Sequence, residues 1–212
     1  MTAPPTIEAR YSDALLNAES YFHPHWERAD AIIIERTWSG EPARESQRAE
    51  ARLLWTNEAL FVRFLCNQAE PPNVRNDPQR DRKTIGLWNT DVCEIFLAPD
   101  SDKPEHYFEF EASPQGEWVD LGIRITPNGR QTDFDFQSGM RVAVEMQAEH
   151  MIVSMEIPWS DVLPRPAAGT TWRVNLFRCA GVGNERYLAW LPTYTDEPSF
   201  HVPEAFGWLK FV

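Results

Sequence analysis

The chain has 212 residues, with 32 acidic and 20 basic side chains and a formal net charge of −12. This charge argues against a protein that binds the phosphate backbone of nucleic acids, because that class relies on clustered lysine and arginine. The longest aliphatic run, residues 31–34, is far too short to cross a bilayer, so neither nucleic acid nor a membrane is an expected partner.

The N-terminal region, residues 1–20, is expected to be an irregular segment of a single domain that spans residues 1–212. It lacks the charged and apolar regions of a secretory signal, which favours a cytoplasmic location on the residues alone. Trp26 follows, just before the aliphatic run, and we expect its ring to fill the core at one end of the domain.

The next two elements are predicted to form a β-hairpin. In residues 51–66, ARLLWTNEALFVRFLC, two apolar runs flank the short polar turn TNEA. Residues 67–86 are polar and contain several prolines, which predicts a long loop that ends just before Trp88.

Residues 87–97, LWNTDVCEIFL, contain a strand with one unexpected residue. Alternation places Val92, Glu94 and Phe96 on one face, and both faces are largely apolar, which predicts a strand covered on both sides. A carboxylate buried without a partner costs several kcal/mol or becomes protonated. Glu94 should therefore have a ligand or a basic partner such as Arg63 or Arg178.

The second half of the chain continues with short strands separated by turns. Strand-length apolar or alternating runs fall at residues 106–113, 140–147, 150–159 and 170–179. Asn128 and Gly129 favour a tight reversal. With almost no helical period, the pattern predicts an all-β fold, a two-sheet antiparallel β-sandwich that is jelly-roll-like and has little helix.

The three cysteines, Cys66, Cys93 and Cys179, each lie in an apolar, strand-like context without a close-spaced partner. We expect them to be buried free thiols, with one disulfide and a leftover thiol as the alternative.

A series of segments in a fixed order resembles the family 9 carbohydrate-binding modules, within a broader group of sandwiches that includes DOMON domains. The resemblance runs from Trp26 to the C-terminus. The segments are LLWTNEALFVRF, LWNTDVCEIFLAPD, YFEFEASPQGEW, VSMEIPW, TWRVNLFR and YLAWLPTYTDEPSFHVPEAFGWLKF.

This resemblance implies a non-catalytic domain that holds a small sugar, or the end of a glucan or xylan chain, between two aromatic side chains. It places these aromatics at Trp88 and Phe200, with Glu94 as the principal hydrogen-bond acceptor. It also implies a location outside the cytoplasm. A pyranose has a flat C–H face and a rim of hydroxyls, so such a set suits it. The lesser candidates for the same site are Asp91, Glu111, Glu197 and His201.

Two departures from the family pattern bear on the ligand. The arginine of the family falls near Glu111, and its asparagine falls near Glu197. With Glu94 and Glu109, such a site would be unusually acidic, while Phe200 in place of tryptophan shrinks the platform. We expect weak sugar binding, a ligand with cationic character, or a bound calcium ion.

Calcium has one further candidate location. Asp100 and Asp102 in APDSDKPE could supply oxygen ligands, although calcium needs six to eight and a solvated turn is the alternative. The scattered histidines and lone cysteines do not form a zinc site.

Two other functional classes stay open at this stage. Glu94, Glu109 and Glu111 could supply the carboxylate pair of a glycosidase. On the DOMON side of the resemblance, His150 and the methionines at 151 and 155 could hold haem, although they also fit an ordinary core face. For Trp88, the alternative to a ligand platform is a buried core tryptophan.

Overall fold

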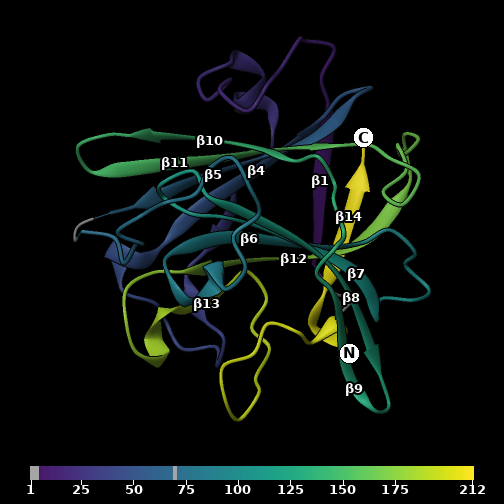
Figure 1. Cartoon of the computed structure of the whole chain (residues 1–212). Coiled ribbons are helices and arrows are strands. Elements are labelled where there is room, and N and C mark those ends of the chain that lie inside the picture. Colours follow the sequence, from purple (N-terminus) through teal and green to yellow (C-terminus); the bar gives the residue numbers. More distant parts are fainter. Residues whose placement is uncertain (1–4, 69–70) are drawn as a thin grey trace.

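The computed structural model describes residues 5–68 and 71–212, and its regular structure is almost entirely β-strand (Figure 1). The strands are β1 (Thr6–Tyr11), β2 (Ile32–Ile34), β3 (Arg36–Thr37), β4 (Ala49–Trp55), β5 (Ala59–Asn67), β6 (Val92–Ala98), β7 (His106–Ala112), β8 (Trp118–Thr126), β9 (Gly129–Asp133), β10 (Arg141–Met146), β11 (His150–Pro158), β12 (Thr171–Cys179), β13 (Tyr187–Ala189) and β14 (Gly207–Phe211). Short 3-10 turns are η1 (Pro24–Arg28), η2 (Glu45–Gln47), η3 (Leu87–Asn89), η4 (Asn184–Arg186) and η5 (Pro203–Ala205). The predicted all-β fold with little helix is confirmed. None of the helices in these described ranges has the length and apolar character needed to span a membrane.

The strands form one curled sheet, in the order β10-β11-β5-β4-β1-β14-β12-β6-β7-β8-β9. We call the strands from β10 to β4, with β2, the first half, and those from β14 to β9, with β13 and β3, the second half. β1 joins the halves through parallel pairing with β4 and with β14 (Figure 1). Pairing within each half is antiparallel, and β1 connects the two halves through its two parallel pairings, so the sheet is mixed.

The expectation of an irregular segment over residues 1–20 is wrong for β1. Ile7 and Ala9 alternate inward in this strand and are 4% and 0% exposed. Their strand pairs with β14 at the far end of the chain, so no local hairpin signal marks it. Trp26 is 2% exposed, which confirms its predicted role as a core residue.

The two halves pack face to face around one apolar core. Leu53 and Phe64 of the first half belong to the same buried cluster as Phe110 of the second half. The thiols of Cys66 and Cys93 meet across this core, with their sulfur atoms 3.4 Å apart. All three cysteines are free and buried, as predicted.

β6 is buried on both faces, as its sequence predicts. Cys93 and Leu97 face the core between the halves. Val92 and Phe96 belong to a second apolar cluster, on the outer face of the second half. Glu94 lies on this outer face and is 2% exposed, so the unusual residue of the strand is indeed a buried carboxyl group.

Candidate functional site

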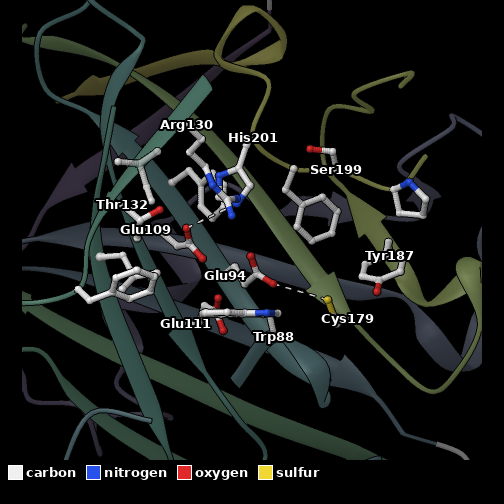
Figure 2. A pocket seen from close by; sticks show the side chains of 16 residues that line it. Trp88, Glu94, Glu109, Glu111, Arg130, Thr132, Cys179, Tyr187, Ser199 and His201 are labelled. Atoms are coloured by element: carbon white, nitrogen blue, oxygen red, sulfur yellow. Dashed lines mark hydrogen bonds and ion pairs between the residues drawn. The ribbon is translucent and has the colours of Figure 1, made fainter. Parts of the chain in front are cut away.

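A cavity of about 300 Å³ opens on the outer face of the second half (Figure 2). Strands β6 to β9 and β12 form its floor, and η3, β13 and the segment 198–201 close its sides. Its lining residues are Trp88, Glu94, Phe96, Glu109, Glu111, Leu121, Ile123, Arg130, Thr132, Phe134, Cys179, Tyr187, Pro198, Ser199, Phe200 and His201.

Three glutamates, which we call the glutamate trio, lie together on the cavity floor. Glu94 comes from β6, and Glu109 and Glu111 come from β7, where their i and i+2 spacing puts both on one face. The antiparallel register places Glu94 opposite Glu111. One carboxylate oxygen from each residue lies within 4.8 Å of the others, so the trio could share one cation. Figure 2 shows Glu94 and Glu109 between Trp88 and His201, and Glu111 beside Trp88.

Few protein groups balance the charge of the trio. Oε1 of Glu94 accepts a weak hydrogen bond from the Cys179 thiol at 3.5 Å. Among the residues that the structure describes, no hydrogen-bond donor reaches either oxygen of Glu111 or Oε2 of Glu109. These side chains are 0% and 3% exposed, so water does not freely replace the missing donors.

The interpretation of Glu94 as the partner of a basic side chain is not supported. Arg178 donates to the backbone carbonyl groups of Arg48 at 2.6 Å and Asn67 at 2.9 Å. Arg63 donates to a backbone carbonyl near the N-terminus at 2.7 Å. Neither guanidinium forms an ion pair with Glu94 within the described part of the chain.

Burial raises the pKa of all three carboxyl groups. For Glu94 and Glu111 the pKa lies well above the usual value, first because of burial and then because of repulsion from neighbouring carboxylates. The pKa of Glu109 is also raised by burial, which the neighbouring carboxyl group of Glu111 and the charge of Arg130 partly offset. The trio therefore retains protons at pH values where a surface glutamate is ionised.

His201 lies at the rim of the cavity. Its Nδ1 atom is hydrogen-bonded to the Tyr107 hydroxyl at 2.8 Å, and its Nε2 atom lies 3.9 Å from Oε2 of Glu109. Burial, and then the charge of Arg130, lower the pKa of His201 to about 3. The ring is therefore neutral near neutral pH, and its contact with Glu109 is not an ion pair.

Aromatic side chains form the walls of the cavity. Trp88 is half-buried, packed against the outer apolar cluster, and exposes part of its ring, unlike a core tryptophan. Phe200 stacks on Phe177, with ring centroids 4.1 Å apart and planes 14° apart, and is 8% exposed. Tyr187 meets Phe200 edge to face at 5.9 Å. Trp88 thus offers more free ring surface to a ligand than Phe200 does.

Arg186 fixes the backbone that carries Trp88. Its guanidinium donates to the carbonyl groups of Trp88 at 2.9 Å, Asn89 at 3.0 Å and Thr90. Charged donors form stronger hydrogen bonds than neutral ones, and Arg186 is only 8% exposed. This clamp holds the last turn of η3 and with it the position of the Trp88 ring.

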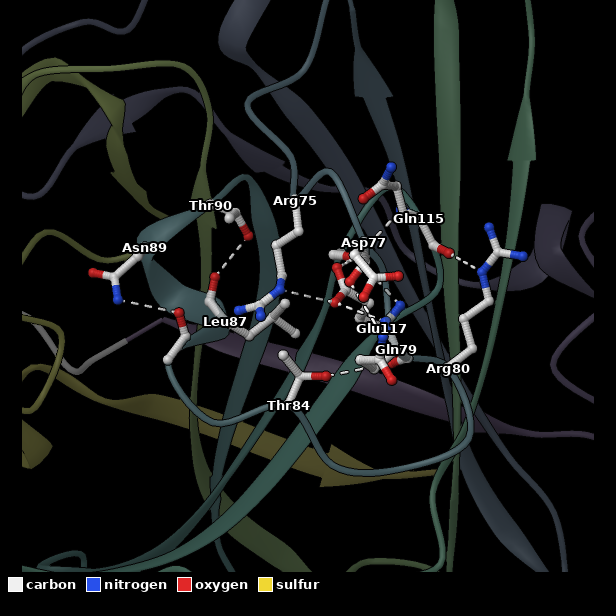
Figure 3. A network of polar contacts seen from close by, with 12 residues as sticks. Arg75, Asp77, Gln79, Arg80, Thr84, Leu87, Asn89, Thr90, Gln115 and Glu117 are labelled. Atoms are coloured by element: carbon white, nitrogen blue, oxygen red, sulfur yellow. Dashed lines mark hydrogen bonds and ion pairs between the residues drawn. The ribbon is translucent and has the colours of Figure 1, made fainter.

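The loop that leads to η3 is fixed by a second polar network (Figure 3). Glu117 accepts hydrogen bonds from the Gln79 backbone at 3.1 Å and the Ser113 hydroxyl at 3.4 Å, and it forms an ion pair with Arg75 at 3.4 Å. The backbone N–H of Thr84 donates to the carbonyl group of Trp118, the first residue of β8, at 2.9 Å. The predicted long loop is therefore anchored at several points before it reaches Trp88.

The structure brings together five of the predicted ligand residues, namely Trp88, Phe200, Glu94, Glu111 and His201. Two others lie elsewhere. Asp91 accepts hydrogen bonds from the backbone N–H groups of Asn73 at 3.1 Å and Gly181 at 2.7 Å, outside the cavity. Glu197 is exposed and does not line the cavity.

Asp100 and Asp102, the residues considered for calcium, lie in the turn between β6 and β7. Oδ1 of Asp100 accepts the Asp102 backbone N–H at 3.1 Å, and Oδ2 pairs with Lys103 at 3.3 Å. Both aspartates are exposed. These contacts are those of a solvated turn, and the acidic group close enough to share a cation in the described residues is the glutamate trio instead.

Several lining or supporting residues carry no signal in the sequence. Arg130, Tyr187 and Cys179 reach the cavity from β9, β13 and β12, and only the sheet order brings them together. Glu109 differs from these residues, because its i and i+2 relation to Glu111 on an alternating strand predicts that the two lie together. Met151 and Met155, considered for haem, are buried between the two halves, as the core interpretation predicts.

Comparison with known families and structures agrees with this architecture. The model of the family described as "Carbohydrate family 9 binding domain-like" matches residues 20–212. The chain belongs to this family. It is a family of non-catalytic carbohydrate-binding modules, as the resemblance of the segments predicted. None of the curated proteins matches the chain.

Solved structures of low sequence identity share the fold of this family 9 chain. A candidate carbohydrate-binding protein from Bacteroides uniformis is 18% identical with a TM-score of 0.74, over 99% of this chain and 100% of that one. A family 9 module from Caldicellulosiruptor kristjanssonii in complex with cellotriose is 18% identical with a TM-score of 0.61, over 98% of this chain and 93% of that one. A family 9 module from Caldicellulosiruptor kristjanssonii in complex with glucose is 19% identical with a TM-score of 0.61, over 98% of this chain and 96% of that one.

Proposed function

We propose that this family 9 domain binds a mono- or oligosaccharide, such as the end of a glucan or xylan chain, in the cavity between Trp88 and Phe200. The observation that carries the proposal is a set of buried carboxyl groups with free oxygens on the floor of an aromatic-walled cavity. A pyranose ring can stack on the exposed face of Trp88 while its hydroxyls donate to Glu94 and Glu111.

The size of the cavity supports recognition of a terminal unit. Its volume of about 300 Å³ lies at the small end of ligand sites, which span roughly 300–1,000 Å³. A single ring fills such a space, and the rest of a chain would extend outward past the rim. The family 9 structures with cellotriose and glucose give the class of ligand to test first.

The arrangement of the carboxyl groups also supports binding without hydrolysis. A glycosidase places its acid and its base or nucleophile on opposite sides of the scissile bond. Glu94 and Glu111 face each other across one strand pair, and Glu109 shares their sheet face. All three would therefore contact a bound ring from the same side.

Isothermal titration calorimetry with glucose, cellobiose, xylobiose and their alditols tests the proposal. We expect saturable binding that Trp88→Ala abolishes with little change in the thermal midpoint, because the ring is half-buried. Trp208→Ala on β14 is the matched control, since Trp208 lies outside the cavity and packs under Arg173. Calorimetry is preferable to fluorescence, because the chain contains nine tryptophans.

The titrations distinguish recognition of the reducing end, failure of the proposed site and a catalytic role. Loss of the response to alditols would show that the site recognises the reducing end. A flat response to every sugar, or equal loss of binding in both tryptophan variants, would overturn the proposed site. Release of monosaccharide from cellobiose or xylobiose during incubation would overturn the non-catalytic role.

A further inference from the structure

The glutamate trio offers more buried acceptor oxygens than a single sugar hydroxyl can satisfy. A sugar hydroxyl has a single O–H donor, so it can serve one carboxylate at a time. Glu111 has two buried oxygens without a donor and Glu109 has one, among the residues described. The positive groups nearby do not fill this gap, because Arg186 is engaged with the backbone of η3 and the Arg130 side chain is exposed at the rim.

The upper limit on the oxygen separations in the trio leaves room for a protonated primary amine. An ammonium group has three N–H donors in a tetrahedral arrangement, and acceptors about 2.8 Å from its nitrogen then lie about 4.6 Å apart. One oxygen from each of Glu94, Glu109 and Glu111 lies within 4.8 Å of the other two. Three acceptors from three residues thus fit three donors from a single cationic group.

The walls of the cavity favour the same class of ligand. Trp88 and Tyr187 line it with aromatic surface, which attracts a cation as well as the C–H face of a sugar ring. An amino group bonded to a ring carbon can reach the floor while the ring itself stacks on a wall. A divalent metal ion fits less well, because calcium needs six to eight oxygens and one oxygen of Glu94 already accepts the Cys179 thiol.

We propose that the cavity selects amino sugars, that is, pyranoses with a free protonated amino group, and that Glu94, Glu109 and Glu111 each accept one N–H bond from this group. This inference rests on the proposed sugar-binding function and specifies its ligand. An N-acetylated sugar lacks the charge and two of the three donors, so it should bind no better than the neutral parent sugar.

Calorimetric titration with glucosamine, glucose and N-acetylglucosamine, at constant salt and with a chelator present, tests the inference. We expect glucosamine to bind at least about tenfold more tightly than the other two, because charge-assisted hydrogen bonds are roughly twice as strong as neutral ones. Glu111→Gln should reduce this ratio to about 1–3, because one of the three charged acceptors is lost. Glu58→Gln is the control, since Glu58 is exposed in the β4–β5 turn, and it should keep the full ratio.

Each other outcome has a defined meaning. Binding of glucose without preference for glucosamine would overturn the inference and leave the proposed function standing. Absence of binding by all three sugars would count against the proposed function itself. A heat signal for calcium alone that Glu111→Gln removes, with no preference for glucosamine in chelator, would overturn the inference in favour of a metal site. A melting curve for each variant shows that it is folded before it is titrated.

Discussion

The second half of the sheet holds two groups of buried carboxylates that differ in one respect, their partners. Glu117 and Asp120, which we call the anchored pair, are 0% exposed, and each is held by an ion pair and by hydrogen bonds from protein groups. Asp120 forms an ion pair with Lys83 at 2.9 Å and accepts the Ser138 N–H and hydroxyl, each at 2.6 Å. The glutamate trio is equally buried but lacks such donors within the described residues.

The difference separates carboxylates that hold the structure from carboxylates that face a ligand. The anchored pair ties the loop before η3 and the segment around Ser138 to β8. Asp120 is the register partner of Phe110, a core residue, so it lies on the opposite face of the sheet from the trio. Burial of acids without partners is costly, and a fold that keeps three of them at a cavity gains from it only when a ligand supplies the donors.

The largest effect should come from breaking the anchored pair. Asp120→Ala removes the ion pair with Lys83, whose side chain is 14% exposed, and leaves the Ser138 donors unpaired. We expect the free energy of unfolding to fall by about 3 kcal/mol. Urea denaturation followed by circular dichroism measures the loss.

A surface pair provides the control for this change. Asp100→Ala removes an ion pair with Lys103 in which both side chains are exposed, and it should change stability by less than about 1 kcal/mol. Equal losses in the two variants would show that Asp120 does not anchor the loops.

A substitution in the glutamate trio should increase the free energy of unfolding rather than lower it. Glu111→Gln replaces a buried, unsatisfied acid by an amide of the same shape that can donate to Glu94 or Glu109. We expect the free energy of unfolding at pH 8 to rise by about 1–2 kcal/mol, because a repelling and desolvated charge is removed. Denaturation of the ligand-free protein checks this, and a clear loss of stability would mean that Glu111 has a structural partner after all.

The sequence predicts on which face of its strand each buried carboxyl group lies, but not which partners that group has. Alternation in residues 92–97 is enough to bury Glu94 on the outer face of a covered strand. The same argument places Glu109 and Glu111 together on one face of their own strand. Local patterns therefore predict which face each carboxyl group occupies.

The features that the sequence does not predict depend on pairing between residues far apart in the chain. β1 was missed because its parallel partners lie about 40 and 200 positions along the chain, so no turn links them. Asp91 was a lesser candidate for the site, yet backbone donors from two loops hold it elsewhere. The clamp by Arg186 was missed for the same reason, since nothing local relates it to Trp88.

The smallest expected effect, and the one most specific to the trio, is the pH dependence that its carboxyl groups give to the free energy of unfolding. For a carboxyl group whose pKa is raised by folding, the folded state binds more protons, so the stability present below the unfolded pKa of about 4.3 is lost as pH rises toward the folded pKa. Glu111 follows this rule, with Glu94, Glu109 and Cys179 facing it and Arg186 and Arg130 nearby.

His201 works in the opposite direction in the same pH range. Its pKa is lowered from 6.5 to about 3, so its contribution is complete above pH 6.5 and is lost as pH falls toward 3. The two trends partly cancel in the wild-type protein between these values. A stability profile of the wild type alone therefore cannot isolate the trio.

The difference between the stability profiles of Glu111→Gln and the wild type isolates the contribution of the trio, because His201 is common to both proteins. The advantage of Glu111→Gln over the wild type should be close to zero near pH 4 and grow by about 1 kcal/mol between pH 5 and 8. Urea denaturation at each pH, with Glu58→Gln measured in parallel, gives this difference. A flat difference would mean that Glu111 titrates as a surface glutamate does, and the contrast between the trio and the anchored pair would then rest on geometry alone.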